Sequence, residues 1–446
     1  MRRFSVQASL PPVPVPPARS LPLWRAIKVA RGNTLAVIPA QAFEVPVFDQ
    51  SSAILGRSFL VSDPEGVKRV LLDEVANYPK SEFQNRIFAA AFGDGILTSG
   101  GETWKAHRRL MAPAFDPRSV EAHAPMMAAT ARAFVDGWRP GETIDVAQAM
   151  AELSLKIIAR AMFSGAGDDL GPRMDQTLRA MDVILADFGL IDVVPGVRGL
   201  RWRARERRIA AGFAVFDSWI AELIGSRRAA PAGGDLLDRL IAARDPETGL
   251  GLSDRQVRDQ LVTIFVAGHE TTAVVLAWTW YLLSQNPEAE ARLHAELDAS
   301  PGAPPAYARQ VVEEAMRIFP PVPRIPLRRA AADDVICGVQ IPKGAYVCVA
   351  PWVIHRHRSL WKDPERFDPG RFAGERPARF SYLPFGAGPR GCIGASLALT
   401  EVAIVLTEVA RRYRLKLAPG QVVAMKPRMT LRPLGRIGME LVARAA

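Results

Sequence analysis

The sequence contains few cysteines and lacks the features of an exported chain. Its three cysteines, at positions 337, 348 and 392 of 446 residues, form neither a close metal-binding pair nor an even set for disulfides. This spacing argues against a disulfide-built secreted protein and favours a reducing compartment. The N-terminus begins Met-Arg-Arg, but prolines interrupt the apolar segment that a secretory signal requires. We therefore expect a cytoplasmic protein without an N-terminal membrane anchor.

The chain also lacks a Gly/Ser-rich linker and an internal repeat. Its low-complexity stretch is the proline-rich Pro11–Pro17, which predicts an extended lead-in over residues 1–20. Helical patterns dominate, and 49% of the residues are apolar, enough for one large core. The segment Ala229–Gly234 predicts a loop rather than a domain boundary. We expect a mostly helical chain that forms a single domain over residues 1–446.

One apolar run, Leu261–Leu283, has the length of a transmembrane helix. Polar residues interrupt its middle, among them His269 and Glu270. Polar groups at the centre of such a segment favour a buried core helix with a functional break. We therefore expect no membrane span.

Positive charge is in excess, with 57 Lys and Arg against 46 Asp and Glu, a formal net charge of +11. No basic–aromatic repeat or nucleic-acid recognition module accompanies this charge, so we expect no nucleic-acid partner. The densest basic run, Arg198–Arg208, holds six arginines and one glutamate and predicts a solvated helix face. The overall field would also attract an acidic electron-transfer protein.

Cys392 stands in the decamer Phe385–Gly394, which has the sequence Phe-Gly-Ala-Gly-Pro-Arg-Gly-Cys-Ile-Gly. The glycines would let a large flat ligand approach the sulfur, and Arg390 would neutralise an acidic group on that ligand. A helical pattern, Ala395–Arg412, follows directly, and a helix N-terminus favours a thiolate over a thiol. A single soft ligand of this kind suits a haem iron whose second axial face stays open.

Two other interpretations of the decamer remain. Its glycines also match the dinucleotide-binding fingerprint, between a possible strand at Phe380–Phe385 and a helix. However, the next strand-like segment, Tyr413–Leu417, ends without an acidic residue for a ribose, and only 52 residues follow Gly394. In the other interpretation, Cys392 is a small buried apolar residue, as most free cysteines are.

A second candidate site lies on a long helix. Ser253 and Gln256 have the spacing of a capping box and predict a helix that runs to about Asn286. In its middle, residues 267–272 have the sequence Ala-Gly-His-Glu-Thr-Thr. Gly268 lowers helix propensity, which is expected where another group passes close to the backbone.

Glu270 and Thr271 place an acid beside an alcohol in this apolar helix. A structural explanation is a threonine that bonds back to its own helix, with Glu270 paired elsewhere. The neighbouring His269 suggests the zinc motif H-E-x-x-H, but Ala273 stands where the second histidine would be. A zinc site is thereby excluded, and the acid–alcohol pair remains a candidate for catalysis.

Two further pairs have the spacing of one helix face. Trp104 and Arg108 are four residues apart, and an indole N–H with a guanidinium suits a carboxylate ligand. An ordinary amphipathic helix with one buried tryptophan would show the same pattern. Glu314 and Arg317 are three residues apart, and by themselves they predict a surface salt bridge.

These motifs together resemble the cytochrome P450 monooxygenases. The haem signature of that family is matched at every fixed position, and four further motifs follow the family's order from Trp104 to the C-terminus. The signature positions here are Phe385, Gly388, Arg390, Cys392 and Gly394.

The resemblance implies a role for each motif. Cys392 would bind the iron of haem b, and the glycines would give clearance for the porphyrin. Glu270 and Thr271 would deliver protons to bound dioxygen. The haem propionates would be held by Trp104, Arg108, Arg390 and Arg328, although Arg329 is an alternative to Arg328. Glu314 and Arg317 would form a buried brace with Arg371.

The resemblance also implies a triangular helical prism with a small β-rich region, formed by residues 30–65 and 325–350. Electrons would come from NAD(P)H through a separate ferredoxin or flavodoxin and its reductase. About 50 residues follow the decamer, so we expect no fused reductase. We expect a monomer.

The substrate stays open. Segments that resemble the family's substrate-contacting regions are apolar: 83–97, 187–194, 265–267, 322–326 and 429–430. A fatty acid, terpenoid, steroid or aromatic compound would suit them. Arg86 and Arg324 would bind a substrate carboxylate, or would instead be surface or propionate-facing charges. A peroxide-using enzyme and a non-catalytic haem sensor or carrier are the alternative functions.

Overall fold

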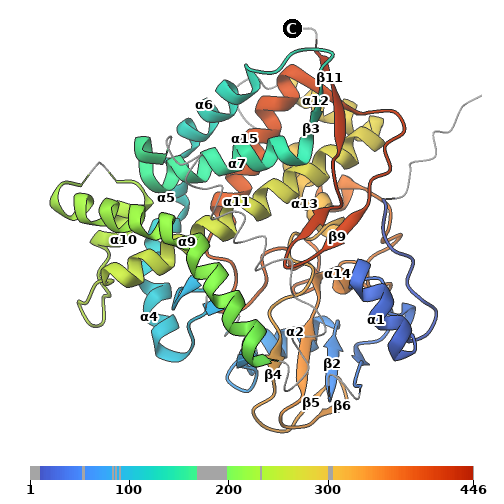
Figure 1. Cartoon of the computed structure of the whole chain (residues 1–446). Coiled ribbons are helices and arrows are strands. Elements are labelled where there is room, and N and C mark those ends of the chain that lie inside the picture. Colours follow the sequence, from blue (N-terminus) through green and yellow to red (C-terminus); the bar gives the residue numbers. More distant parts are fainter. Residues whose placement is uncertain are drawn as a thin grey trace, which may run out of the picture.

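The structure, a computed structural model, describes residues 11–444 except 53–55, 83–84, 86–87, 90–91, 168–197, 232–233 and 300–304. Helices form most of this part of the chain, and small sheets lie at its edges (Figure 1). The helices are α1 (Leu23–Gly32), α2 (Pro64–Lys68), α4 (Gly101–Met111), α5 (Pro117–Glu121), α6 (Ala124–Val135), α7 (Val146–Phe163), α9 (Arg198–Ala229), α10 (Leu236–Ala242), α11 (Asp254–Gln285), α12 (Pro287–Ala299), α13 (Ala306–Ile318), α14 (Pro351–Ile354) and α15 (Ala395–Arg412). Short 3₁₀ or π turns are η1 (Ala40–Phe43), η2 (Arg69–Asp73), η3 (Ala112–Phe115), η4 (Ser164–Gly167) and η6 (Pro369–Phe372).

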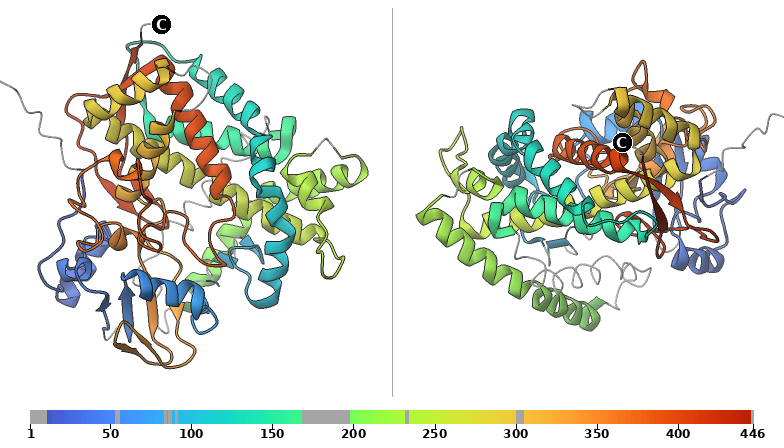
Figure 2. Two further views of the ribbon diagram at one scale, coloured as in Figure 1. Left: turned by 180° about the vertical axis from the view of Figure 1, so that it is seen from behind. Right: turned by 90° about the horizontal axis from the view of Figure 1, so that it is seen from above.

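Helix α11 runs through the middle of the core. The Ser253 hydroxyl accepts from the Gln256 N–H, and the Gln256 side chain accepts from the Ser253 N–H, so the predicted capping box is confirmed. The helix packs against α7, α13 and α15, while α9 crosses one side of the helical body (Figure 2). These contacts bury almost every apolar side chain of α11.

Among the described residues, two helices are long and apolar enough to cross a membrane, α11 and the Arg207–Ala229 part of α9. In α11, 83% of the apolar window is buried inside the protein. This burial confirms the prediction of a core helix over Leu261–Leu283.

The predicted β-rich region is confirmed as a mixed sheet with the order β1-β2-β7-β4. The middle pair, β2 and β7, is parallel, with Leu60 opposite Cys348. A separate hairpin, β5–β6, lies beside this sheet (Figure 1). The bounds are β1 (Val47–Asp49), β2 (Ser58–Val61), β4 (Arg328–Arg329), β5 (Asp334–Ile336), β6 (Val339–Ile341) and β7 (Tyr346–Val349).

The C-terminal part adds two more sheets, with the orders β3-β11-β8 and β10-β9. Their strands are β3 (Thr143–Asp145), β8 (Tyr413–Leu417), β9 (Met425–Pro427), β10 (Leu431–Pro433) and β11 (Gly438–Ala443). The strand at 413–417 and the helix at 395–412 agree with the sequence prediction. The strand expected at Phe380–Phe385 is wrong: these residues form turns, because Phe380 has a φ of 69° and Gly386 a φ of 68°, which interrupt extended backbone.

Candidate haem site

The Cys392 loop, residues 385–394, is a tight turn in front of α15. The Cys392 N–H donates to the Phe385 carbonyl at 2.9 Å, and the Gly391 N–H donates to the Gly388 carbonyl at 3.0 Å. Arg108 on α4 reaches the loop from the side, where its Nη1 donates to the Gly391 carbonyl at 2.9 Å. The Cys392 side chain stays accessible at the end of this turn. The loop therefore presents the sulfur while its backbone is fixed from within.

The backbone gives two of the loop glycines a structural role. Gly386 and Gly388 both have positive φ, 68° and 69°, a conformation that other residues adopt only with strain. A Cβ on Gly388 would lie 1.8 Å from the Leu71 carbonyl oxygen in η2. A left-handed turn requires glycine at both positions, and close packing against η2 also requires it at Gly388, whereas clearance for a porphyrin stays a prediction.

The protein alone does not lower the pKa of Cys392. Burial raises the pKa of the thiol, while a hydrogen bond from the Gly394 backbone and the nearby Arg108 guanidinium lower it only in part. Gly394 is the N-cap of α15, so the predicted stabilisation by a helix N-terminus is present. In this site desolvation outweighs it, and a thiolate there requires a bound cation.

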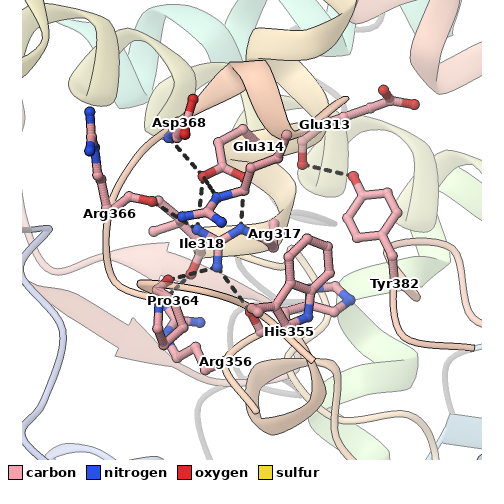
Figure 3. Close-up of polar contacts among 12 residues, drawn as sticks. Glu313, Glu314, Arg317, Ile318, His355, Arg356, Pro364, Arg366, Asp368 and Tyr382 are labelled. Atoms are coloured by element: carbon pink, nitrogen blue, oxygen red, sulfur yellow. Dashed lines mark hydrogen bonds and ion pairs between the residues drawn. The ribbon is translucent and has the colours of Figure 1, made fainter. Parts of the chain in front are cut away.

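Figure 3 shows the polar contacts of a brace that is centred on Arg317. Glu314 and Arg317 on α13 are both 0% exposed and form a bidentate pair, with N–O distances of 2.7 and 2.8 Å. Arg371 in η6 places its Nε 3.4 Å from Glu314. The remaining Arg317 donors reach backbone carbonyls of His355, Pro364 and Arg366. The structure thus brings the three brace residues together.

The brace connects directly to the chain that enters the Cys392 loop. The Tyr382 hydroxyl donates to the Glu313 carbonyl on α13 at 2.8 Å (Figure 3). The Leu383 N–H donates to His355 Nε2 at 2.7 Å, and the His355 carbonyl accepts from Arg317. Two hydrogen bonds therefore fix the segment that immediately precedes Phe385.

A cluster of cations lies beside the loop. The Arg390 guanidinium lies 3.9 Å from the ring centroid of Trp104 and donates to the Ser99 carbonyl at 2.9 Å. Arg328 is 4% exposed, and its Nε has no hydrogen-bond partner. Lys80 pairs with Arg328 in a β-bridge and donates through Nζ to the Leu97 carbonyl at 2.5 Å. We call Lys80, Arg328 and Arg390 the cation cluster.

Burial acts on all three members, and repulsion from a neighbouring cation acts on Lys80 and Arg390. Burial, followed by the charges of Arg390 and Arg328, lowers the pKa of Lys80 to about 7. Burial lowers the pKa of Arg328 to about 10, and burial with Arg328 lowers that of Arg390 to about 10. Within the described chain, no carboxylate forms an ion pair with any of them. Buried cations without a counter-charge are suited to an anionic ligand.

Lys80 was not among the predicted site residues. No local pattern marks it, since its role depends on the bridge to Arg328, which is far away in sequence. Of the other predicted carboxylate partners, Arg329 is exposed and donates to the Gly344 carbonyl. Arg328, buried within the cation cluster, is therefore the better candidate of the two.

On α11, Glu270 is 5% exposed and is held by the C-terminal hairpin. Its Oε1 accepts from Arg432 Nε at 2.5 Å and from the Thr430 hydroxyl, while its Oε2 is buried without a hydrogen-bond partner. Thr271 is half-buried and donates to the Ala267 carbonyl at 2.7 Å. Thr271 thus bonds back to its own helix and Glu270 is paired with another element, as the structural explanation of this pair predicts. Oε2 of Glu270 nevertheless has no hydrogen-bond partner.

Arg432 is a second residue that the sequence analysis missed. Thr430 and Arg432 alternate at the edge of β10, so both point to the same side, toward Glu270. This alternation of an alcohol and a cation was visible in the sequence. The sequence did not reveal that both residues bind Glu270, because Glu270 lies on another element, α11.

Comparison with known proteins decides the family. A family model described as Cytochrome P450 matches residues 55–437. The chain belongs to the cytochrome P450 family. It is 34% identical over 387 residues to cyclooctat-9-en-7-ol 5-monooxygenase of Streptomyces melanosporofaciens, covering 82% of this chain and 81% of the relative. Cyclooctatin synthase of the same organism is 35% identical, over 76% of each chain.

Solved structures agree with this family. The haem domain of cytochrome P450DA superimposes with a TM-score of 0.82 at 27% identity, covering 97% of this chain and 98% of the other. The predicted P450 fold, mostly helical with a small β-rich region, is thereby confirmed. The protein is a P450 monooxygenase, a haem-iron oxidoreductase.

The residues of this P450 fit haem b, the group that the family implies. An accessible Cys392 thiol suits the iron, which would supply the cation that favours the thiolate. The cation cluster offers one buried and two half-buried cationic side chains to the propionates, beside the Trp104 indole. Arg108, which donates to the Gly391 carbonyl of the Cys392 loop, would lie beside the bound haem.

Some predicted positions fall on residues outside those that the structure describes. These are Arg86, the apolar segment 187–194 and parts of the segment 83–97. The side chains of residues 198–206 in the basic run are outside as well, whereas Arg207 and Arg208 are exposed.

Proposed function

We propose that this P450 hydroxylates an apolar organic substrate, with electrons from NAD(P)H delivered by a separate ferredoxin or flavodoxin and its reductase. The observation that carries the proposal is the intact acid–alcohol pair on α11, with Glu270 Oε2 unpartnered and Thr271 accessible. A bound haem with a thiolate ligand supplies the activation of dioxygen, because the thiolate favours O–O cleavage. The side chains of the protein then have to supply protons, position the substrate and exclude water.

Proton transfer would use the free groups of this pair. Arg432 and Thr430 fix Oε1 of Glu270, so Oε2 is the oxygen that carries or accepts a proton. The Thr271 hydroxyl hydrogen is directed to the Ala267 carbonyl, which leaves the lone pairs of the oxygen as acceptors. The Thr271 oxygen would thus position a proton donor in the haem site by accepting its hydrogen bond, and Oε2 of Glu270 would hold the proton that is delivered to the site.

The substrate would be a small apolar compound. The relatives are named for cyclooctat-9-en-7-ol and cyclooctatin, which favours a terpenoid over the other apolar classes. A peroxide-using enzyme is disfavoured by the intact Glu270–Thr271 pair. We also propose that residues 1–446 form one domain that works as a cytoplasmic monomer with haem b.

The experiment is a comparison of two neighbouring threonines. Thr271 is accessible, whereas Thr272 is 2% exposed and makes the equivalent bond to the Gly268 carbonyl at 2.9 Å. Thr271→Ala should lower product formed per NAD(P)H about tenfold or more and divert electrons to peroxide, because a proton relay is lost. Thr272→Ala should leave this coupling unchanged. Both are measured with surrogate redox partners and a substrate that shifts the haem spin state.

Unchanged coupling in Thr271→Ala would contradict the role of the pair. A non-catalytic sensor or carrier predicts a different result: the wild-type protein would consume almost no NAD(P)H, whatever compound is bound.

A further inference from the structure

Arg324 lies on a backbone segment that is fixed from several sides. The Leu431 N–H donates to the Pro321 carbonyl at 2.9 Å, which joins the segment to β10. The Ile325 N–H donates to the Val349 carbonyl at 2.9 Å, which joins it to β7. The segment therefore bridges the hairpin that holds Glu270 and the sheet near the N-terminus, and the position of Arg324 is well defined.

The same segment borders the Cys392 loop. The Ile325 side chain approaches Gly386 so closely that a Cβ on that glycine would be 4.0 Å from Ile325 Cδ1. Arg324 is the next residue along the chain. Arg324 therefore belongs to a segment that borders the candidate haem site.

The Arg324 side chain is accessible and yet surrounded by protein. It is exposed, but its Nη2 donates to the Thr34 carbonyl at 2.8 Å, and it lies near the buried thiol of Cys348 on β7. Burial lowers the pKa of Arg324, which does not happen to a guanidinium on an open surface. Arg324 is thus accessible although protein surrounds it.

Arg324 has no counter-charge in the part of the chain that the structure describes. Its hydrogen-bond acceptor is a neutral carbonyl, and burial raises the pKa of the neighbouring Cys348 thiol, so the thiol stays neutral. A guanidinium has five N–H donors, and most of them are left for a ligand. Two other arginines near the site differ in this respect: Arg317 and Arg432 each pair with a glutamate.

Arg324 is also distinct from the cation cluster. Arg328 acts on Lys80 and Arg390, whereas the titratable group near Arg324 is the neutral thiol of Cys348. Its neighbours on the segment are apolar, Val322, Pro323 and Ile325. A guanidinium with free donors binds a carboxylate through charge-assisted hydrogen bonds, and these apolar neighbours do not compete for the donors.

We propose that Arg324 binds a carboxylate of the substrate, so that this P450 selects amphipathic acids with an apolar body and one acidic end. The inference rests on the proposed function of the same site and narrows its substrate class. A terpenoid acid or a fatty acid satisfies it, and a neutral hydrocarbon does not. The apolar body would lie toward the iron, while Arg324 sets which carbon is presented.

The test uses the haem-loaded full-length enzyme and matched pairs of ligands. Abietic acid is compared with abietinol, and hexadecanoic acid with hexadecan-1-ol, by titration of the spin-state shift of the Soret band. In the wild-type protein the acid of at least one pair should bind more tightly than the alcohol. Arg324→Gln should weaken binding of that acid about tenfold or more and change binding of its alcohol little. Arg324→Lys should restore part of the preference.

Arg329→Gln is the matched control, because Arg329 is an exposed arginine five residues further on. It should leave the ratio of acid to alcohol affinity unchanged. Equal loss for acid and alcohol in Arg324→Gln would overturn the inference, as would a wild-type preference for both alcohols. Faster haem release in Arg324→Gln would overturn it too, because Arg324 would then serve a propionate.

The same samples separate this inference from the function on which it rests. A normal carbon monoxide spectrum and tight binding of an alcohol, without any preference for the acid, would reject the role of Arg324 and leave the monooxygenase intact. Absence of that spectrum in the wild-type protein would reject both.

Discussion

The brace and the cation cluster both hold charged side chains that are buried or half-buried. In the brace a positive charge is paired with a negative one, whereas in the cation cluster the positive charges have no carboxylate partner among the described residues. In the brace, Glu314 and Arg317 satisfy each other, and the remaining donors of Arg317 reach carbonyl oxygens. In the cation cluster, Lys80 and Arg390 reach only carbonyl oxygens, and Arg328 keeps an unpartnered Nε.

This difference separates residues that stabilise the fold from residues that hold a ligand. A buried pair that loses one partner leaves an uncompensated charge, so each partner of the brace depends on the other. A buried cation without a partner costs free energy in the protein alone. Binding of an anion offsets this unfavourable free energy. The brace should therefore control folding, and the cation cluster should control retention of haem.

The largest effect is expected in the brace. Arg317→Met should lower the free energy of unfolding by about 3–5 kcal/mol, because it leaves Glu314 buried and unpaired. The measurement is chemical denaturation of the purified full chain, followed by circular dichroism. Glu314 is 0% exposed, so water cannot compensate for the lost guanidinium.

Arg309→Met is the matched control on the same helix. Arg309 forms an ion pair with Glu313 at 3.3 Å, but its side chain is 54% exposed. Loss of such a surface pair costs about 0–1 kcal/mol. If the two variants were equally stable, the brace would not be a structural element.

A smaller effect, on a different quantity, is expected in the cation cluster. Arg328→Met should change the free energy of unfolding of the protein by less than about 1 kcal/mol, because it removes an unpaired buried charge. It should release haem about tenfold faster, because one charge-assisted bond to a propionate is lost. Transfer of haem to excess apomyoglobin measures this rate.

Arg329→Met provides the comparison for haem release. Arg329 is adjacent to Arg328 on β4 but is exposed, so its loss should leave the rate unchanged. Haem release that is faster in Arg329→Met than in Arg328→Met would reverse the assignment of the propionate partner.

Much of the helical framework could be predicted from the sequence. The capping box at Ser253 and the apolar periodicity after Gly394 gave the bounds of α11 and α15, because both signals are local. Arg371 was predicted as the third brace residue only through the resemblance to the family. Its contact with Glu314 spans a long stretch of sequence, which no local pattern encodes.

The features that the sequence did not reveal have a common physical cause. The role of Gly388 depends on a positive φ and on the approach of Leu71, and neither is visible in a linear sequence. The turn at Phe380 is likewise a matter of backbone conformation. Lys80 and Arg432 act through partners on other elements, so their functions appear only when the chain is folded.

The central claim is that the Cys392 sulfur ligates the iron, and one spectrum tests it. The reduced carbon monoxide complex of the purified wild-type protein should show the red-shifted Soret band of a thiolate-ligated haem. Cys392→Ser should lose this band, and Cys337→Ser, which changes an exposed cysteine elsewhere, should keep it. Persistence of the band in Cys392→Ser would contradict the claim.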